Sequence, residues 1–476
     1  MANPLFIEQA YLNGKFVSSN NQFDVINPST NKPIGSLPNL TVADCEQSII
    51  DADKAWKKWK NVPLGERSAI TRRLFDLINK NKEYLAEIMT LESGKPYNES
   101  LGEVDYANSF VEWFAEEGKR TYGETIPSLK DNLRLSTIKQ GVGVVAAITP
   151  WNFPLAMITR KLAPALVAGC TMVLKPASQT PFSAIALAKL AEEAGVPAGV
   201  FSVITSRDSA GIGKELATNP LIRKITFTGS TDVGKTLMEQ AASTIKRISF
   251  ELGGNAPFVV FDDADIDEAV KGAIAGKFRN AGQTCVSINR FYVQESIYDL
   301  FAQKLAEEVK KLKVADGFDK NSQVGPLINN KAVKKVQHHI DDAVSHGAEI
   351  LAGGTLIEGN FFSPTVLTNL SNECLIKTEE TFGPICALFK FKTEEEAIQE
   401  ANDTPYGLAA YFYSENIKRC YRVAEAIEAG MIGINTGLIS NAAAPFGGVK
   451  LSGIGREGSK HGIDEYMELK YLCYGV

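Results

Sequence analysis

Cys285 is the residue of this chain best suited to covalent chemistry, and Glu251 lies 34 residues before it. A cysteine thiolate attacks carbonyl carbons, and a carboxylate can afterwards activate the water that releases an acyl group. The other cysteines fit the role of small buried hydrophobes. Cys285 differs because it ends a polar, glycine-bearing loop, Phe278–Cys285. The pair therefore predicts nucleophilic attack on a carbonyl carbon, with a carboxylate as base.

A side-chain amide and two guanidinium groups could complete such a site. Asn152 lies in the turn Thr149–Pro154 and could donate a hydrogen bond to an oxyanion. It could also cap the helix expected from Leu155, and on these residues alone the cap is favoured. Arg160 and Arg279 could bind a carboxylate, although most arginines are solvated or form surface ion pairs.

Two further stretches have the composition of a dinucleotide site. Lys175-Pro176-Ala177-Ser178 follows a predicted strand, where doubly wound folds bind an adenosine ribose, although Lys175 could also be a solvated lysine. Phe227–Gly234 joins a strand to a helix and could present N–H groups to a pyrophosphate, or could be an ordinary glycine turn. The match of Gly141–Ala146 to G-x-G-x-x-A is rejected, because a buried strand follows it where a helix is needed.

Regular alternation of strands and helices must position these residues. Apolar runs at 142–149, 171–174, 200–204, 224–227 and 246–250 predict five buried strands, with helices at 155–168, 181–195, 208–218 and 231–242 between them. This order predicts a doubly wound parallel sheet with its ligands at the carboxyl ends of the strands. A second alternation follows from 258 to 434. The segment 123–140 predicts a projecting hairpin, and the alternating tail 459–476 predicts an edge strand that joins a partner subunit.

Composition excludes several classes of protein. The chain has 476 residues, enough for two or three domains, with 44% hydrophobic and 22% charged residues. A net charge of −6 gives no support to a nucleic-acid partner, and no apolar run is long enough for a membrane span. Seven scattered cysteines and the lack of a secretory signal predict a cytoplasmic location. No metal is expected, because none of the four histidines falls in a motif.

These stretches together resemble the aldehyde dehydrogenase superfamily, and within it the NADP-accepting succinate-semialdehyde dehydrogenases. The resemblance covers essentially the whole chain. The matching runs occur in the family's order: Thr149–Pro154, Met157–Lys161, Lys175–Pro181, Phe227–Ser230, Glu251–Pro257, Lys277–Cys285, Glu379–Pro384, Gly437–Ser440, Pro445–Lys450 and Gly455–Gly458.

The resemblance implies an α/β fold with a doubly wound parallel-sheet cofactor domain, an α/β catalytic domain and a small β oligomerisation arm. It implies that 1–122 and 141–250 form the cofactor-binding domain and 251–435 the catalytic domain. The segments 123–140 and 459–476 would form the arm, and 436–458 would return toward the cofactor domain and the active site. A homodimer or homotetramer is expected.

The resemblance also implies roles for individual residues. Cys285 is similar to the nucleophile, Glu251 to the general base, and Asn152 with the Cys285 N–H to the oxyanion hole. Arg160, Arg279 and Ser440 match a clamp for a distal carboxylate. The residues that match cofactor positions are Thr149, Pro150, Trp151, Lys175, Pro176, Ala177, Ser178, Gly229, Ser230, Leu252, Glu380 and Phe382. Ser178 stands where NAD-specific members carry a glutamate, so NADP is the preferred cofactor, with NAD as an alternative.

The implied reaction is oxidation of succinate semialdehyde to succinate through a cysteine thiohemiacetal and a thioester. The same chemistry on glutarate semialdehyde or a sulfonated aldehyde is an alternative, because one methylene changes binding by only a few kcal/mol. A catalytically idle binding or structural protein on the same scaffold is the alternative from another class. Cys285-Val286-Ser287 lacks the second cysteine with which some relatives form a regulatory disulfide, so a redox switch of that kind is not expected.

Overall fold

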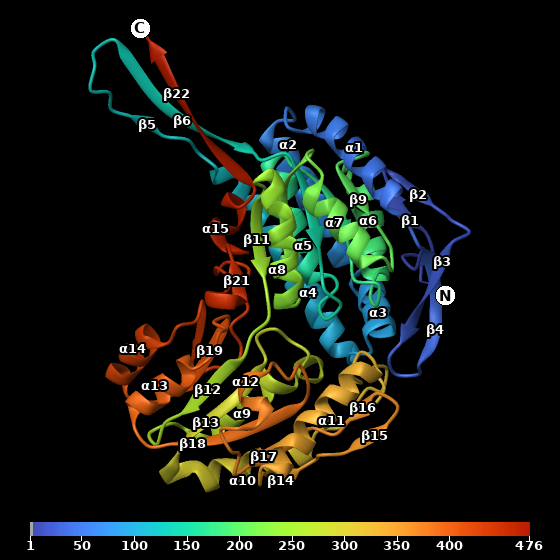
Figure 1. The fold of residues 1–476 in the computed structure, drawn as a ribbon. Helices are drawn as coiled ribbons and strands as arrows, with labels where there is room; N and C mark the ends of the chain where they lie inside the picture. The colour runs from blue at the N-terminus through green and yellow to red at the C-terminus, as the bar shows by residue number, and fades with distance from the viewer. Residues whose placement is uncertain (1–2) are drawn as a thin grey trace.

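Two large β-sheets organise the chain, one in each of two α/β lobes (Figure 1). The structure is a computed structural model, and it describes residues 3–476. The first lobe holds an eight-stranded sheet in the order β2-β1-β9-β8-β7-β10-β11-β21. The second lobe holds a seven-stranded sheet in the order β14-β17-β18-β13-β12-β19-β20. A three-stranded arm projects from the first lobe (Figure 1).

Five parallel strands form the centre of the first sheet, as their continuous apolar runs predict. The chain runs from β7 through β8 to β9 in one direction and then returns to β10 beside β7. The carboxyl ends of β7 and β10 therefore meet at the point where strand order reverses, which is where ligands bind in such sheets. The strands and their crossover helices are β7 (Val144–Ile148), α5 (Ala156–Ala168), β8 (Thr171–Lys175), α6 (Phe182–Ala194), β9 (Phe201–Val203), α7 (Ser209–Thr218), β10 (Ile222–Thr228), α8 (Thr231–Ala241) and β11 (Arg247–Glu251).

The N-terminal part of the chain covers this sheet. Helices α2 to α6 share one apolar core, while α1, α7 and α8 pack on the opposite face. Pro63, Asn81 and Gly94 separate the four helices of the N-terminal stretch, and Gly94 has a φ of 76°. The elements are β1 (Ala10–Leu12), β2 (Lys15–Val17), β3 (Gln22–Asn27), β4 (Lys32–Pro38), α1 (Val42–Trp59), α2 (Leu64–Lys80), α3 (Lys82–Ser93) and α4 (Tyr97–Glu117).

The second sheet is parallel except for β14, which pairs antiparallel with β17. The strands are β12 (Ala256–Val260), β13 (Ile288–Gln294), β14 (Glu349–Ala352), β17 (Thr365–Thr368), β18 (Ile385–Phe391), β19 (Ala409–Tyr413) and β20 (Met431–Ile434). The helices are α9 (Ile266–Phe278), α10 (Tyr298–Lys310), α11 (Asn330–Ser345), α12 (Leu375–Thr378), α13 (Glu394–Asn402) and α14 (Ile417–Ala426). A small hairpin of β15 (Leu356–Glu358) and β16 (Phe361–Phe362) lies beside them. After β20 the chain returns to the first sheet as β21 (Gly453–Ile454), which pairs with β11.

The arm consists of β5 (Thr125–Ile126), β6 (Leu133–Gly141) and β22 (Met467–Gly475). β22 pairs antiparallel with the whole length of β6, from Met467 opposite Gly141 to Gly475 opposite Leu133. The C-terminal strand predicted from residue 459 begins later, because Ser459–Asp464 forms a helix, α15. Ile463 of this helix is buried, and a side chain on Gly462 would collide with Phe114, so the segment packs on the first lobe.

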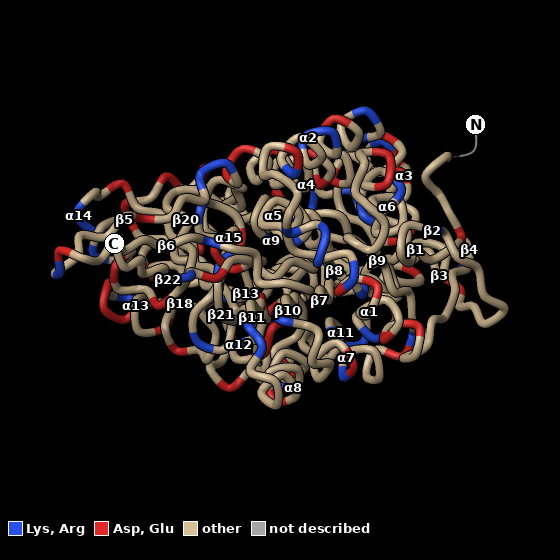
Figure 2. Tube along the Cα trace, turned by 90° about the horizontal axis from the view of Figure 1, so that it is seen from above, with Lys and Arg blue, Asp and Glu red and all other residues tan. Residues whose placement is uncertain are grey.

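Basic residues and acidic residues are interspersed along the trace (Figure 2). Within residues 3–476, no helix has the length and apolarity that a membrane crossing requires.

Candidate active site

A cavity of about 220 Å³ lies where the two lobes meet. Its walls come from the carboxyl ends of β7, β10 and β11, the loop that ends at Cys285, and the segment after α12. Two wider hollows, of about 590 and 650 Å³, share no residue with it. The lining residues are Pro150, Trp151, Asn152, Met157, Thr228, Gly229, Ser230, Leu252, Gly253, Cys285, Glu380 and Phe382. All except Met157, Thr228 and Gly253 are residues that the sequence predicts for the site.

The loop before Cys285 makes a left-handed turn. Asn280, Ala281 and Gly282 have φ values of 51°, 55° and 76°, which turn the chain sharply after α9. Gln283 secures the turn, because its amide donates to the Asn280 carbonyl at 3.0 Å and accepts the Ile328 N–H at 2.8 Å. Cys285 is consequently held, half-buried, at the cavity wall.

The environment of Cys285 favours the protonated thiol. Burial raises its pKa to about 11, and the carboxylates of Glu251 and Glu380 act in the same direction. The guanidinium groups of Arg160 and Arg279 oppose this shift. Because only the thiolate is a strong nucleophile, these two guanidinium groups favour the reactive form of Cys285.

Asn152 directs its amide toward the cysteine loop. Its Nδ2 donates to the Gln283 carbonyl at 3.1 Å, and its Oδ1 accepts the Phe153 N–H at 3.1 Å. The second N–H of that amide is left for another acceptor. The interpretation of Asn152 as the cap of the following helix is wrong: α5 is preceded by Leu155 and has no side-chain cap from that residue.

Glu251 ends β11 and is buried, and its Oε2 has no hydrogen-bond partner. Burial raises its pKa well above the usual range, and the nearby carboxylate of Glu457 raises it further. Arg160 and Lys161 counteract part of this effect. A carboxyl group with a raised pKa is a stronger base once it ionises, which suits activation of water.

Arg160 is fully buried in α5. It forms an ion pair with Glu457, and its guanidinium carbon lies 4.2 Å from the centre of the Phe446 ring. Its Nη1 and Nη2 have no hydrogen-bond partner within the protein. Lys161, also fully buried, bonds both to Glu457 and to the Thr228 hydroxyl, the latter at 2.6 Å. Sequence reasoning noted the runs that contain Lys161 and Glu457 but assigned neither residue a role, since 296 residues separate them.

Tyr106 of α4 is a further residue to which sequence reasoning assigned no role. Its hydroxyl is buried and without a partner in the protein. Burial raises its pKa, while Arg160, Arg279 and the Ser440 hydroxyl lower it, so all three lie near the phenol oxygen. Arg279 is half-buried, with its guanidinium carbon 5.1 Å from the Phe153 ring centre. No spacing in the sequence connects α4 with Cys285, so only the fold reveals this neighbour.

The features needed to hold a dinucleotide lie along the first sheet. Lys175, the last residue of β8, is buried, and burial lowers its pKa to about 8. Its ammonium donates only to the Pro176 carbonyl, at 3.3 Å, and Ser178 lies half-buried beyond it. Ser230 precedes α8 without capping it, which leaves first-turn N–H groups for an anion. This donor set fits the phosphates of a dinucleotide.

Another part of the cavity wall offers a carboxylate that could bind a ribose and aromatic rings that could pack beside a nicotinamide. Glu380 accepts the Gly254 N–H at 3.1 Å, and burial raises its pKa to about 7. A Cβ on Gly253 would lie 3.2 Å from Glu380 Oε2, so a side chain there would require this carboxylate to shift by a few tenths of an ångström. Trp151 and Phe382 meet edge to face, with ring centres 5.6 Å apart.

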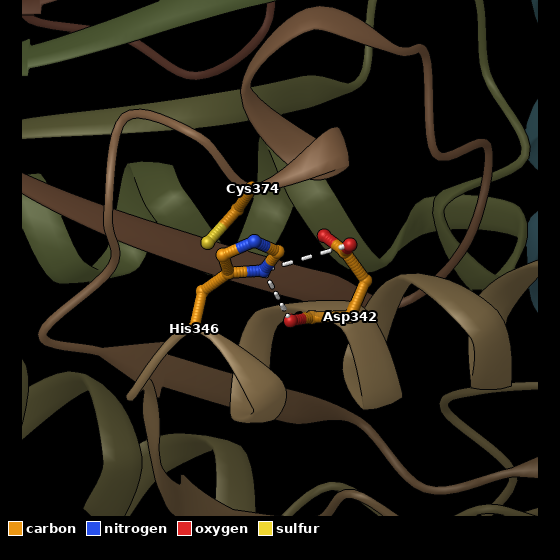
Figure 3. A group of neighbouring side chains, drawn as sticks. All are labelled: Asp342, His346 and Cys374. Atoms are coloured by element: carbon orange, nitrogen blue, oxygen red, sulfur yellow. Dashed lines mark hydrogen bonds and ion pairs between the residues drawn. The ribbon is translucent and has the colours of Figure 1, made fainter.

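A separate group of potential metal ligands lies at the end of α11 (Figure 3). Asp342 Oδ2 accepts the Leu375 N–H at 2.8 Å, and His346 Nδ1 lies 2.9 Å from the Asp342 carbonyl oxygen. Cys374 is buried beside them. The hydrogen bonds join the end of α11 to the start of α12, and none of the three residues lines the cavity.

Comparisons with known proteins agree with this geometry. The model of the aldehyde dehydrogenase family matches residues 16–472. A glutarate-semialdehyde dehydrogenase of Pseudomonas putida is 58% identical over 99% of this chain and 98% of its own. An NADP-dependent succinate-semialdehyde dehydrogenase of Escherichia coli is 56% identical over the same shares. The crystal structure of a succinate-semialdehyde dehydrogenase from Burkholderia pseudomallei superposes with a TM-score of 0.98, at 54% identity and full coverage of both chains.

Proposed function

This chain belongs to the aldehyde dehydrogenase family, and we propose that its substrate is an aldehyde with a carboxylate at the far end, succinate semialdehyde first. The protein is an NAD(P)-dependent aldehyde dehydrogenase. The observation that carries the substrate proposal is the pair of buried Nη groups of Arg160, which lack any acceptor in the protein. Buried donors are nearly always satisfied, so an anion is the expected occupant.

The mechanism follows from the positions of three residues. The Cys285 sulfur attacks the aldehyde carbon, and the thiol proton leaves toward solvent or a neighbouring base. The free N–H of Asn152 and the N–H of Cys285 stabilise the oxyanion that forms. A nicotinamide dinucleotide held through Lys175, Ser230 and Glu380 would supply the hydride acceptor for oxidation of the thiohemiacetal to the thioester. Glu251 then takes a proton from water, whose oxygen attacks the thioester carbon and releases the acid and the thiol.

The far end of the substrate is bound by cations. Arg279 and the Nη groups of Arg160 supply charged donors, and Ser440 and Tyr106 supply hydroxyl groups. A neutral aldehyde would leave these donors unpaired, so the pocket selects against it.

The cofactor we propose is NADP. Lys175 is buried beside the half-buried Ser178 and bonds only to a backbone carbonyl, so its charge is available to a 2′-phosphate. A glutamate at position 178 would repel that phosphate. The E. coli relative is named as NADP-dependent.

Glutarate semialdehyde is the second candidate substrate, because the P. putida relative at 58% identity carries that name. A sulfonated aldehyde would suit the same arginines. The test is a kcat/KM panel of semialdehydes with increasing chain length, a sulfoaldehyde and butanal, each with NADP and NAD. Succinate semialdehyde with NADP should give the highest value. A maximum at glutarate semialdehyde would move the assignment by one methylene, and a maximum at butanal would overturn the anionic class.

We also propose a cytoplasmic homo-oligomer. The exposed strand β22 carries apolar side chains along an unpaired edge, which is a surface suited to a second copy of the chain.

A further inference from the structure

A buried group of charges lies behind the active site and has no part in the mechanism given above. Lys95, between α3 and α4, forms an ion pair with Glu103 of α4, with Nζ and Oε2 2.5 Å apart. Both side chains are 1% exposed. Glu99 lies one helical turn before Glu103. Buried charges are expensive unless they are paired and hydrogen-bonded, so their other partners show what this group does.

Lys95 and Glu103 both hold the turn that carries Asn152. The ammonium of Lys95 donates to the Asn152 carbonyl at 2.7 Å. Glu103 Oε1 accepts the N–H groups of Leu155 and Ala156 at 3.0 and 3.2 Å, at the start of α5. The Glu103 carboxylate therefore caps the start of α5. Asn152, which precedes α5 by several residues, does not cap the helix, and its side chain lines the cavity.

Glu99 and Asn280 connect the same turn to the cysteine loop. Glu99 Oε2 accepts the Asn280 N–H at 2.8 Å. The Asn280 amide donates to the Asn152 carbonyl at 3.1 Å and to the Gln283 carbonyl at 3.2 Å. Gln283 in turn accepts from Asn152 Nδ2. The two donors of the oxyanion site thus come from different lobes, and one network anchored on α4 fixes their separation.

We propose that Lys95 is a positioning residue that, together with Glu103, sets the direction of the Asn152 amide relative to the Cys285 N–H. This inference rests on the proposed function, in which those two groups bind the oxyanion. Without Lys95 the Asn152 carbonyl keeps only the Asn280 donor, and Glu103 keeps a buried charge without a cation. The turn can then rotate, and a small displacement of an oxyanion donor lowers the rate of the chemical step.

The first test is Lys95→Met, with the neutral pair Lys95→Met/Glu103→Gln as a second variant that leaves no unpaired carboxylate and so protects folding. Both should lower kcat about ten- to a hundredfold, as expected for a displaced oxyanion donor. KM for succinate semialdehyde and Kd for NADP should stay within about twofold, because binding groups are untouched. Lys246→Met is the matched control: Lys246 is another buried lysine bonded to backbone carbonyls, but to those of Asn219 and Ile222. It should leave kcat unchanged.

A double-mutant cycle with Asn152→Ala separates positioning from general damage. If Lys95 acts through Asn152, Lys95→Met should lower kcat little further in the Asn152→Ala background. Additive losses, or equal losses for Lys95→Met and Lys246→Met, would overturn the inference. A wild-type kcat for Asn152→Ala alone would instead refute the oxyanion role in the proposed function, so the two failures are distinguishable.

Discussion

Burial raises the pKa of Cys285 and of Glu251 and so favours the protonated, less reactive form of each side chain. The pKa of the Cys285 thiol rises to about 11 and that of Glu251 well above its usual range. Each must lose a proton before it acts, so both half-reactions should accelerate as pH rises. The opposing influence comes from Arg160, which favours the ionised form of both groups. One guanidinium thus acts on the proposed nucleophile and the proposed base, and it is also the proposed partner of the substrate carboxylate.

Substitutions at these two residues should separate the half-reactions. Cys285→Ala should abolish oxidation. Glu251→Gln should still give one burst of NADPH per active site, because the base is needed only when the thioester is hydrolysed. Rapid-mixing absorbance of reduced cofactor measures the burst. A Glu251→Gln enzyme that binds cofactor normally but gives no burst would show that Glu251 also deprotonates Cys285.

The two arginines should behave differently when removed. Arg279→Ala should lower kcat/KM for succinate semialdehyde about ten- to a hundredfold, from loss of one charge-assisted hydrogen bond. Butanal, which has no carboxylate, should be affected far less. Arg160→Ala should impair both substrates and lower Tm, because it also leaves Glu457 with one buried cation instead of two. Parallel losses on both substrates for Arg279→Ala would refute its substrate role.

Local sequence reasoning singled out Cys285 and Glu251 as a possible nucleophile and base, whereas for Asn152 it favoured a helix cap and only the family resemblance implied the oxyanion role. It assigned no role to Lys95, Glu103, Tyr106 or Glu457. Each is an ordinary charged or aromatic residue on a helix or loop, and its role depends on partners far along the chain. Burial converts such residues from surface groups into site components, and a single sequence carries no direct signal of that burial.

At the scale of elements, the ends of strands decide where ligands can bind. The five central parallel strands of the first sheet were predictable because parallel strands buried on both faces are continuous apolar runs. β17, a strand of four residues, escaped prediction. α15 escaped because its six residues are too few for helical periodicity to stand out. The carboxyl end of β8, by contrast, was predicted from the sequence. Two tests can therefore be directed at residues there, Lys175 and Ser178.

NADP affinity should depend on pH through Lys175. Burial lowers its pKa to about 8, so the free protein has the cation below that pH and a neutral amine above it. The Kd for NADP should therefore rise as pH increases through about 8, while the Kd for NAD, which has no 2′-phosphate, should change little. Fluorescence titration across this range measures both. Parallel curves for the two cofactors would show that Lys175 does not face the 2′-phosphate.

Ser178→Glu should reverse the cofactor preference. A carboxylate beside Lys175 repels the 2′-phosphate and accepts hydrogen bonds from a ribose diol. The ratio of kcat/KM with NADP to kcat/KM with NAD should fall. The double variant Ser178→Glu/Glu251→Gln should still give the burst of reduced cofactor when NAD is used. An unchanged ratio would place recognition of the 2′-phosphate elsewhere.

At the scale of the whole molecule, the arm is the part least explained by the single chain. On β22, Leu469 is 64% exposed and Tyr471 is 58% exposed. Large apolar side chains exposed together on one strand indicate a contact with another protein chain. Leu469→Glu/Tyr471→Glu should lower the mass measured by light scattering toward that of one chain. Ile245→Glu, at a residue 92% exposed on the first lobe, is the control and should not. An unchanged mass in the arm variant would exclude this strand as the interface.

The separation of Arg160 and Lys161 from Glu457 also has a consequence for biosynthesis. When the ribosome has passed β11, the chain contains the two buried cations Arg160 and Lys161. The carboxylate of Glu457, with which both are paired, follows 296 residues after Lys161 and has not yet been made. The edge strand β21 belongs to the same late portion. We therefore expect the first lobe to close around its centre only after Glu457 and β21 have been made. We therefore expect a chain that ends before position 457 to be inactive and prone to capture by chaperones and proteases.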